Sequence, residues 1–371
     1  MLEISELIYL SLAILFCFMM TWGVGANDLA NVMSTSMGSK AITVRQGIVI
    51  AIIFELLGAL FGGGNVTETM RDGIIEISQL ENNPIILIEG MLAILLAGTI
   101  WMNAASYFGV PVSITNAIVG SMVGFGSVVL GFDSIHWQQV AYIGVSWVTS
   151  PMISGFIAYL IMISIQILIF GKKNPVEYSK KLLPFYLFLV GLVLGFITIY
   201  KGISRFNIDL SLTHDVLIVV GSALIFTYLG LVLTKRIKTK NILKRRDRFQ
   251  VVEDQFAILV GFTACAMVFA HGANDVSIAV GPLTVIYSLV HHVKAFDAET
   301  YPVWITLLGC IGVTTGFVMY GRKVIETVGS SITALTPSRA YAATIAAATT
   351  VIISTSLGIP VSATQTLVGA V

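Results

Sequence analysis

Charged side chains are scarce in this chain of 371 residues. Asp, Glu, Lys and Arg make up 11% of it, whereas soluble domains carry about 25%. Hydrophobic residues make up 56%, and the mean hydropathy is +0.90. This balance excludes an ordinary soluble domain and predicts an all-α polytopic membrane protein. No stretch interleaves basic with aromatic residues, so we expect no nucleic-acid partner.

Cysteines and an N-terminal basic segment are lacking too. Cys17, Cys265 and Cys310 lie far apart in apolar runs, which excludes a disulfide framework and a cysteine metal site. The residues before the first apolar run include Glu3 and Glu6 but no Lys or Arg, unlike the basic start of a cleaved signal peptide. We therefore expect the first apolar run to remain in the mature protein.

Long apolar runs make up most of the sequence. A helix needs about 20 apolar residues to cross a bilayer. The run 138–170 exceeds this length, and we count it as one crossing because Pro151 can kink it and its end can extend into water. The runs are 7–24, 46–64, 85–108, 110–132, 138–170, 183–200, 214–234, 254–270, 276–292, 302–320, 338–357 and 359–371.

Two turns between these runs are apolar, although turns in water are normally polar. One contains Gly109-Val110-Pro111, and the other contains Gly358-Ile359-Pro360. An apolar turn of this kind predicts a tip buried in protein at membrane depth, and hence a re-entrant helical hairpin. We expect the first hairpin at about 85–132 and the second from about 338. The alternative is a pair of full crossings joined by a tight turn.

The placement of Lys and Arg predicts the orientation in the membrane. Segment 235–248 is rich in both and holds Asp247 as its one acidic residue, so we expect it in the cytoplasm. Counting crossings back from it places the N-terminus outside a cell (inner or plasma) membrane. The segment most simply sets the topology, and binding of lipid or a partner is the alternative.

A tetrapeptide inside two of the apolar runs carries the main functional prediction. Asp28, in Gly25-Ala26-Asn27-Asp28, is the one charged residue between Leu7 and Gly38. A carboxylate at bilayer depth costs about 2.5 kcal/mol or more, so it normally faces a protein interior and serves a function. Gly, Asn and Asp also disfavour a continuous helix, so we expect a break that frees backbone groups for binding.

The same tetrapeptide returns as Gly272-Ala273-Asn274-Asp275, and the halves match at two further places. Gly58 and Gly62 fit Gly312 and Gly316 loosely, and the segments that begin at Pro111 and Pro360 match in register. An odd number of crossings separates the copies, which predicts two inverted-topology repeats with discontinuous helices, the architecture of secondary transporters. We expect repeats at 1–170 and 253–371, with connecting transmembrane helices and the basic loop at 171–252.

Each hairpin tip begins a second helix, and a helix N-terminus attracts anions. Pro111 and Pro360 suit the first turn of that helix. A single Ser or Thr there would act as a helix cap, but two facing tips favour a site for a small multivalent anion. The hydroxyl groups that we expect to face it belong to Ser113, Thr115, Ser362 and Thr364.

No Lys or Arg lies in these four motifs, so helix dipoles and co-bound cations must neutralise the anion. Asp28, Asp275, Asn27, Asn31 and Asn274 supply oxygen atoms that suit Na⁺. A carboxylate also accepts a hydrogen bond from protonated phosphate, which fully deprotonated sulfate does not offer. The residues therefore favour phosphate as the anion and Na⁺ as the coupling ion, with H⁺ carried by an Asp as the alternative.

The duplicated Gly-Ala-Asn-Asp stretches, with Pro-Val-Ser-Ile-Thr-Asn and Pro-Val-Ser-Ala-Thr-Gln, resemble those of the inorganic phosphate transporter (PiT) family. The resemblance covers both halves. It implies a symporter that imports inorganic phosphate with Na⁺ by alternating access, as a homodimer, without a covalent cofactor. The alternative within the family is a H⁺-coupled phosphate or metal-phosphate symporter.

The resemblance also assigns site residues. As phosphate ligands it implies Asn27, Asp28, Ser113, Thr115, Asn116, Asn274, Asp275, Ser362, Thr364 and Gln365. As Na⁺ ligands it implies Asn27, Asp28, Asn31, Asn116, Asn274, Asp275 and Gln365. Glu55 matches an acidic position of the first repeat and is either a coupling group or half of a structural ion pair. Its counterpart in the second repeat falls near Gly309.

Two alternatives lie outside transport by a symporter. His271, His291 and His292 suggest an intramembrane enzyme, but no metalloprotease motif is present and His271 matches Val24 in the other half. We therefore expect no enzyme activity. Occluding hairpins argue against a channel. The second repeat stops earlier than the first, so we expect the native chain to continue beyond Val371.

Overall fold

Helices form nearly all the regular structure that this computed structural model describes. It describes residues 4–62, 66–67, 69–70, 73–76, 80, 83–197, 212–235, 237, 245–291, 302–331 and 335–371. An isolated β-bridge joins Ile75 to Ile135. Most of the basic segment 236–244, most of the acidic stretch 68–82 and His292 lie outside the described residues.

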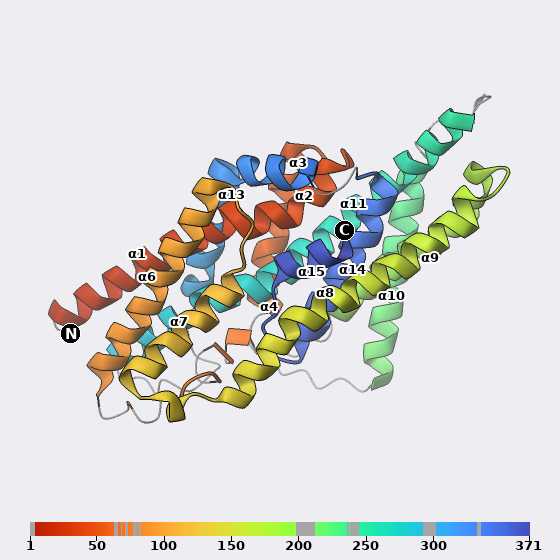
Figure 1. Cartoon of the computed structure of the whole chain (residues 1–371). Coiled ribbons are helices and arrows are strands. Elements are labelled where there is room, and N and C mark those ends of the chain that lie inside the picture. Colours follow the sequence, from red (N-terminus) through yellow and green to blue (C-terminus); the bar gives the residue numbers. More distant parts are fainter. Residues whose placement is uncertain are drawn as a thin grey trace.

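The first half of the chain forms helices along the apolar runs of the sequence (Figure 1). Its elements are α1 (Ile4–Val24), η1 (Gly25–Leu29), α2 (Ala30–Gly38), α3 (Val44–Ile50), η2 (Ala51–Glu55), α4 (Leu56–Gly62), α6 (Pro84–Phe108), α7 (Ile114–Val129), η4 (Phe132–Ser134), α8 (Trp137–Ile165) and η5 (Gln166–Phe170).

The second half of the chain begins with two connecting helices, α9 and α10. Its elements are α9 (Pro175–Ile197), α10 (Leu212–Thr234), α11 (Arg245–His271), η8 (Gly272–Val276), α12 (Ser277–Val290), α13 (Val303–Ser331), α14 (Pro337–Ser356) and α15 (Ala363–Ala370).

Membrane spanning is supported by 8 described helices that are long and apolar enough to cross a bilayer. The run 138–170 forms one of them, Trp137–Phe170, with Pro151 inside, as expected. The prediction of an all-α polytopic membrane protein is confirmed.

The expected helix breaks are milder than predicted. Both tetrapeptides lie in single π-helical turns, Gly25–Leu29 and Gly272–Val276, inside helices that continue on either side. A π turn adds one residue to the ring that each hydrogen bond closes, and it often marks a functional site. The helices Ile4–Gly38 and Arg246–Val290 therefore continue through the two tetrapeptides, so each holds an Asn-Asp pair in the protein interior.

The two hairpin turns have closely similar backbones. Gly109 has φ 70 and Gly358 has φ 71, a left-handed conformation that glycine adopts without strain. Ser113 and Ser362 are the N-caps of the helices that follow. The placement of Pro111 and Pro360 in the first helical turn is therefore wrong. Each proline lies two residues before the cap because the extended serine, and not the proline, starts the helix.

The two halves interlock through glycines that another helix approaches closely. A Cβ atom on Gly25 would lie 1.8 Å from the carbonyl oxygen of Val313. A Cβ atom on Gly272 would lie 2.3 Å from the carbonyl oxygen of Glu55. α13 of the second half thus packs on the π turn of the first half, and the end of η2 packs on the π turn of the second.

A second pair of contacts repeats this pattern. A Cβ on Gly316 would lie 1.8 Å from the carbonyl oxygen of Trp22, and one on Gly58 would lie 2.1 Å from that of Phe269. Trp22 and Phe269 occupy matching positions before the two tetrapeptides. The backbone contacts of the two halves therefore correspond.

This correspondence corrects the alignment of the repeats. Glu55 corresponds to Val313 and not to a position near Gly309, and Gly58 corresponds to Gly316. The shift is about one helical turn. Gly312 and Gly316 are themselves one turn apart, so the glycine pattern alone fits either alignment.

Candidate functional site

The side chains of two asparagines hold the two hairpin turns. The Asn27 amide donates to the carbonyl of Val110 (2.9 Å) and accepts from the backbone N–H of Val112 (3.0 Å). The Asn274 amide donates to the carbonyl of Val361 (2.6 Å) and accepts from the N–H of the same residue (3.4 Å). Each π turn thus carries the amide that positions the hairpin of its own half.

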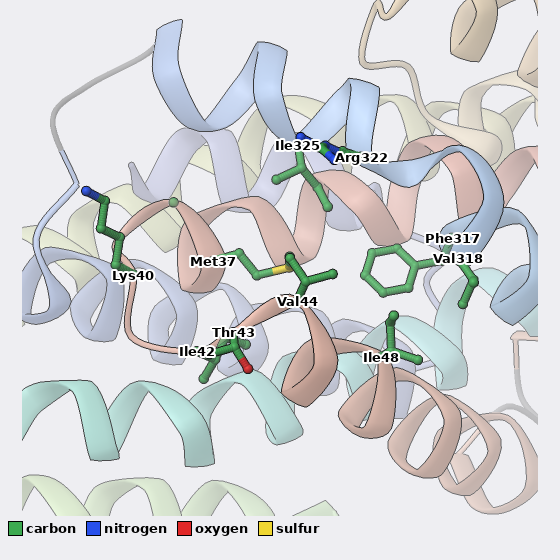
Figure 2. Close-up of a pocket in the computed structure, with 11 residues that line it drawn as sticks. Met37, Lys40, Ile42, Thr43, Val44, Ile48, Phe317, Val318, Arg322 and Ile325 are labelled. Atoms are coloured by element: carbon green, nitrogen blue, oxygen red, sulfur yellow. The ribbon is translucent and has the colours of Figure 1, made fainter.

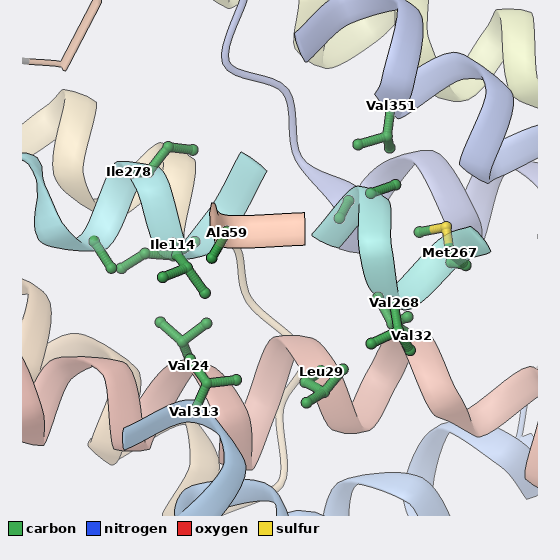
Figure 3. Packing of buried hydrophobic residues seen from close by; sticks show 14 of the residues in the cluster. Val24, Leu29, Val32, Ala59, Ile114, Met267, Val268, Ile278, Val313 and Val351 are labelled. Carbon is green, nitrogen blue, oxygen red and sulfur yellow. The ribbon is translucent and has the colours of Figure 1, made fainter. Parts of the chain in front are cut away.

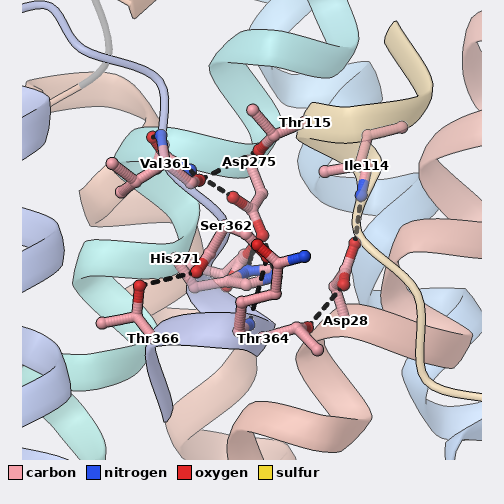
Figure 4. A network of polar contacts seen from close by, with 12 residues as sticks. Asp28, Ile114, Thr115, His271, Asp275, Val361, Ser362, Thr364 and Thr366 are labelled. Carbon is pink, nitrogen blue, oxygen red and sulfur yellow. Dashed lines mark hydrogen bonds and ion pairs between the residues drawn. The ribbon is translucent and has the colours of Figure 1, made fainter. Parts of the chain in front are cut away.

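Asp28 connects both hairpins, as Figure 4 shows. Its Oδ2 accepts a hydrogen bond from the backbone N–H of Ile114 (3.1 Å), at the start of α7. Its Oδ1 accepts one from the hydroxyl of Thr364 (2.6 Å), at the start of α15. The hydroxyl of Thr115 donates to the carbonyl of Val361 (2.9 Å), so the two tips also touch directly.

The chemistry of this cluster suits an anion that carries its own protons. Asp28 is 1% exposed and Thr364 is 5% exposed, so water contributes little to their solvation. A hydrogen bond to a charged group contributes about 1.5–3 kcal/mol. Two helix N-termini and several hydroxyls supply donors at this point, and the carboxylates supply acceptors.

The second carboxylate has different partners. Nδ1 of His271 lies 2.7 Å from Oε1 of Glu55, and Nε2 of His271 lies 3.0 Å from Oδ2 of Asp275. The Asn274 amide also donates to Asp275. These side chains are fully buried or nearly so. The Glu55–His271 contact is compatible with both roles expected for Glu55, a coupling group or half of a structural ion pair.

The matching place in the first half is apolar. Val24 corresponds to His271 and Val313 corresponds to Glu55, and Figure 3 shows both valines in the buried core. The sequence analysis set His271 aside because the repeat does not share it. Its spacing from Asp275, one turn along a helix, was the signal for an interaction.

A family model described as "Phosphate transporter family" matches residues 24–371, which include both π turns and both hairpins. The chain belongs to that family. The resemblance noted from the motifs is confirmed, and the enzyme alternative is excluded because members of the family are transporters.

Relatives from all domains of life support this membership. The "Putative phosphate permease" of Haemophilus influenzae is 41% identical over 358 residues, which cover 96% of this chain and 85% of the relative. One from Thermococcus kodakarensis is 39% identical, covering 98% and 87%. "Inorganic phosphate transporter 2-1, chloroplastic" of Arabidopsis thaliana is 37% identical, covering 96% and 64%.

A solved structure has the same fold. It is described as "The sodium-dependent phosphate transporter", and it superimposes with a TM-score of 0.87 at 35% identity. The match covers 98% of this chain and 88% of that one. This phosphate transporter fold thus extends over nearly the whole chain.

Three amides that were expected to bind Na⁺ lie near the cluster without hydrogen bonds to their oxygen atoms. Oδ1 of Asn31, Oδ1 of Asn116 and Oε1 of Gln365 are buried and have no hydrogen-bond partner among the described residues. Buried polar atoms normally have one. These oxygen atoms are therefore available to coordinate a cation or to accept a hydrogen bond from a ligand.

The two capping serines differ. Ser362 Oγ accepts from the backbone N–H of Gln365 (3.1 Å), so it caps α15 in this structure. Ser113 makes no such bond at the start of α7. The structure thus gathers predicted residues of the π turns and tips in one buried region, and His271 links Glu55 to Asp275 of the second π turn.

Proposed function

We propose that this member of the phosphate transporter family is a Na⁺-coupled symporter that imports inorganic phosphate by alternating access. In this proposal residues 1–170 and 253–371 form two inverted repeats in the plasma membrane. The N-terminus lies outside, and segment 235–248 lies in the cytoplasm. The related structure described as sodium-dependent supports Na⁺ as the coupling ion. A homodimer, which the family resemblance implies, belongs to the same proposal.

Phosphate binds between the hairpin tips in this proposal. Backbone N–H groups at the starts of α7 and α15 and the hydroxyls of Thr115 and Thr364 donate to its oxygen atoms. Asp28 and Asp275 accept from its protons. The observation that carries the proposal is the position of Asp28, which touches the start of α7 and the Thr364 hydroxyl of α15 together.

Na⁺ occupies the oxygen-rich positions around the tips. The carboxylates of Asp28 and Asp275 supply negative charge, and the amide oxygens of Asn31, Asn116 and Gln365 supply neutral ligands. A cation there offsets the repulsion between the carboxylates and the anion. Phosphate and Na⁺ would then stabilise each other, which is the physical basis of coupled transport.

Two contacts on opposite halves support a gate made of the hairpins. The Lys323 ammonium donates to the carbonyl of Tyr107, where α6 ends. The Thr69 hydroxyl donates to the carbonyl of Gly358, in the second turn (2.8 Å). Each hairpin turn is thus held by a segment of the other half. We propose that these contacts open alternately during transport.

A H⁺-coupled symporter is the second candidate, because the Glu55–His271–Asp275 chain is of a kind that carries protons in pumps. One experiment separates the two. The protein is reconstituted into liposomes, and uptake of ³²P-labelled phosphate is measured at fixed pH with external Na⁺ or choline. Na⁺ coupling predicts uptake in Na⁺ alone. Equal uptake in choline, abolished by a protonophore, would establish the second candidate.

A further inference from the structure

A pocket of about 820 Å³ lies between the turn that joins α2 to α3 and the second half of α13 (Figure 2). None of the residues assigned to phosphate or Na⁺ lines it. The transport proposal therefore leaves this pocket without a function.

Two cationic residues and several apolar ones line the pocket. In Figure 2, Lys40 lies at one end, and Arg322 lies beside Ile325 on the wall between Lys40 and Phe317. Phe317 and Val318 of α13 form the opposite end, and Ile48 of α3 lies beneath them. Both cationic residues are exposed. A ligand that fills this space must combine an anionic group with a hydrocarbon chain.

The apolar end continues into surfaces that face lipid. Along η2, Ile52 and Ile53 are 48% and 47% exposed. Along α13, Ile311 and Met319 are 56% and 72% exposed. Exposed aliphatic side chains on membrane-spanning helices contact acyl chains. The pocket therefore opens toward the hydrocarbon of the bilayer.

The turn that carries Lys40 is fixed in place. Lys40 has φ 60, rare for a residue with a side chain, and its N–H bonds to the carbonyl of Met37 (2.9 Å). Thr43 and Gln46 form a capping box at the start of α3. Lys40 is thus presented to the pocket by ordered backbone on both sides.

We propose that this pocket binds one anionic phospholipid. Its phosphodiester lies against Lys40 and Arg322, and one acyl chain lies between Ile48 and the α13 side chains Phe317 and Val318. Free phosphate would contact only the cationic residues of the pocket and leave its apolar residues uncovered. A zwitterionic lipid would fit the apolar end but would place a second cation near the two basic groups.

Bound lipid would act on the helices that hold the transport site. α2 begins directly after the Asp28 π turn, and α13 packs on that turn through Val313. A lipid between the α2–α3 turn and α13 bridges these elements. It would stabilise the protein by binding the folded state and not the unfolded chain.

The test uses the full-length protein, purified in detergent and stripped of lipid. Phosphatidylglycerol and phosphatidylcholine with identical acyl chains are titrated in, while thermal unfolding and native mass spectrometry are recorded. We expect one tightly retained phosphatidylglycerol per chain, a larger rise in Tm than with phosphatidylcholine, and at least tenfold tighter apparent binding.

Two variants and a matched control locate the site. Lys40→Gln/Arg322→Gln should lose the preference for phosphatidylglycerol, and Val318→Trp should lose the retained lipid by filling the apolar end. Lys173→Gln/Lys180→Gln removes the same charge from exposed positions elsewhere and should behave as wild type. Equal binding of both lipids, retained preference in the first variant, or displacement of phosphatidylglycerol by inorganic phosphate would overturn the proposal.

Discussion

The hydroxyl of Thr364 donates a 2.6 Å hydrogen bond to Oδ1 of Asp28, so the carboxylate of one half holds the hairpin tip of the other. The residues are far apart in sequence, and both are buried. Thr115, which corresponds to Thr364, bonds instead to the backbone of Val361. The two matching threonines thus have different hydrogen-bond acceptors: a carboxylate for Thr364 and a backbone carbonyl for Thr115.

Replacing Thr364 with valine keeps the shape of the side chain and removes the hydroxyl. Loss of a hydrogen bond to a charged group costs about 1.5–3 kcal/mol, or about 10- to 100-fold in affinity. We expect the KM for phosphate to rise by that factor, with a smaller change in the KM for Na⁺. Thr364→Ser, which restores the donor, is the control. An equal loss for both ions would assign Thr364 to the cation.

The contribution of the buried Glu55–His271 pair to stability can be tested with a double mutant, because the matching residues in the other half, Val313 and Val24, are both apolar. His271→Val alone leaves a buried carboxylate without its partner, which costs about 3–5 kcal/mol. Glu55→Val/His271→Val copies the Val313 and Val24 arrangement and should recover most of that stability. Thermal unfolding in detergent measures both. A double variant no more stable than His271→Val would contradict the pairing.

The close contacts between helices predict that Gly→Ala substitutions at different glycines have very different effects on thermal stability. Gly316→Ala would place a Cβ 1.8 Å from the carbonyl oxygen of Trp22, whereas a Cβ on Gly144 meets no atom within 4 Å. We expect Gly316→Ala to lower the thermal stability strongly and Gly144→Ala to leave it unchanged or raise it. Equal stability of the two proteins would show that α1 and α13 do not approach as closely as described.

The hairpin contacts predict selective opening of each turn. Lys323→Gln should speed labelling of Val110→Cys by a membrane-impermeant thiol reagent, and Thr69→Val should speed labelling of Leu357→Cys. Each variant should leave the other turn unchanged, because the two contacts hold different hairpins. Faster labelling at both turns in either variant would point to general loosening instead.

Much of the fold follows from the sequence because a bilayer restricts the choices. Apolar runs of sufficient length must form helices in lipid, where backbone polar groups need internal partners. The two tetrapeptides and the two proline motifs also marked the region of the candidate site, since a buried Asp requires partners. Asn27, Asp28 and Asn274 contact the hairpin segments that those motifs mark.

The remaining features depend on packing that no local pattern encodes. Single π turns stand at the two tetrapeptides, where the local residues predicted full helix breaks. The correspondence of Glu55 with Val313 becomes visible only from the backbone carbonyls that approach Gly272 and Gly25. His271 has no counterpart in the other half, so comparing the repeats removed the one side chain that makes the two carboxylates inequivalent.

Equilibrium binding of labelled phosphate to the purified protein tests the central claim most directly. Wild type, Asp28→Asn and Asp275→Asn are compared with and without Na⁺, after gel filtration shows that each is folded. We predict saturable, Na⁺-dependent binding by wild type, resistant to excess sulfate, and loss of that binding in both variants. Binding by either variant at wild-type affinity would contradict a phosphate site between the two π turns and the hairpin tips.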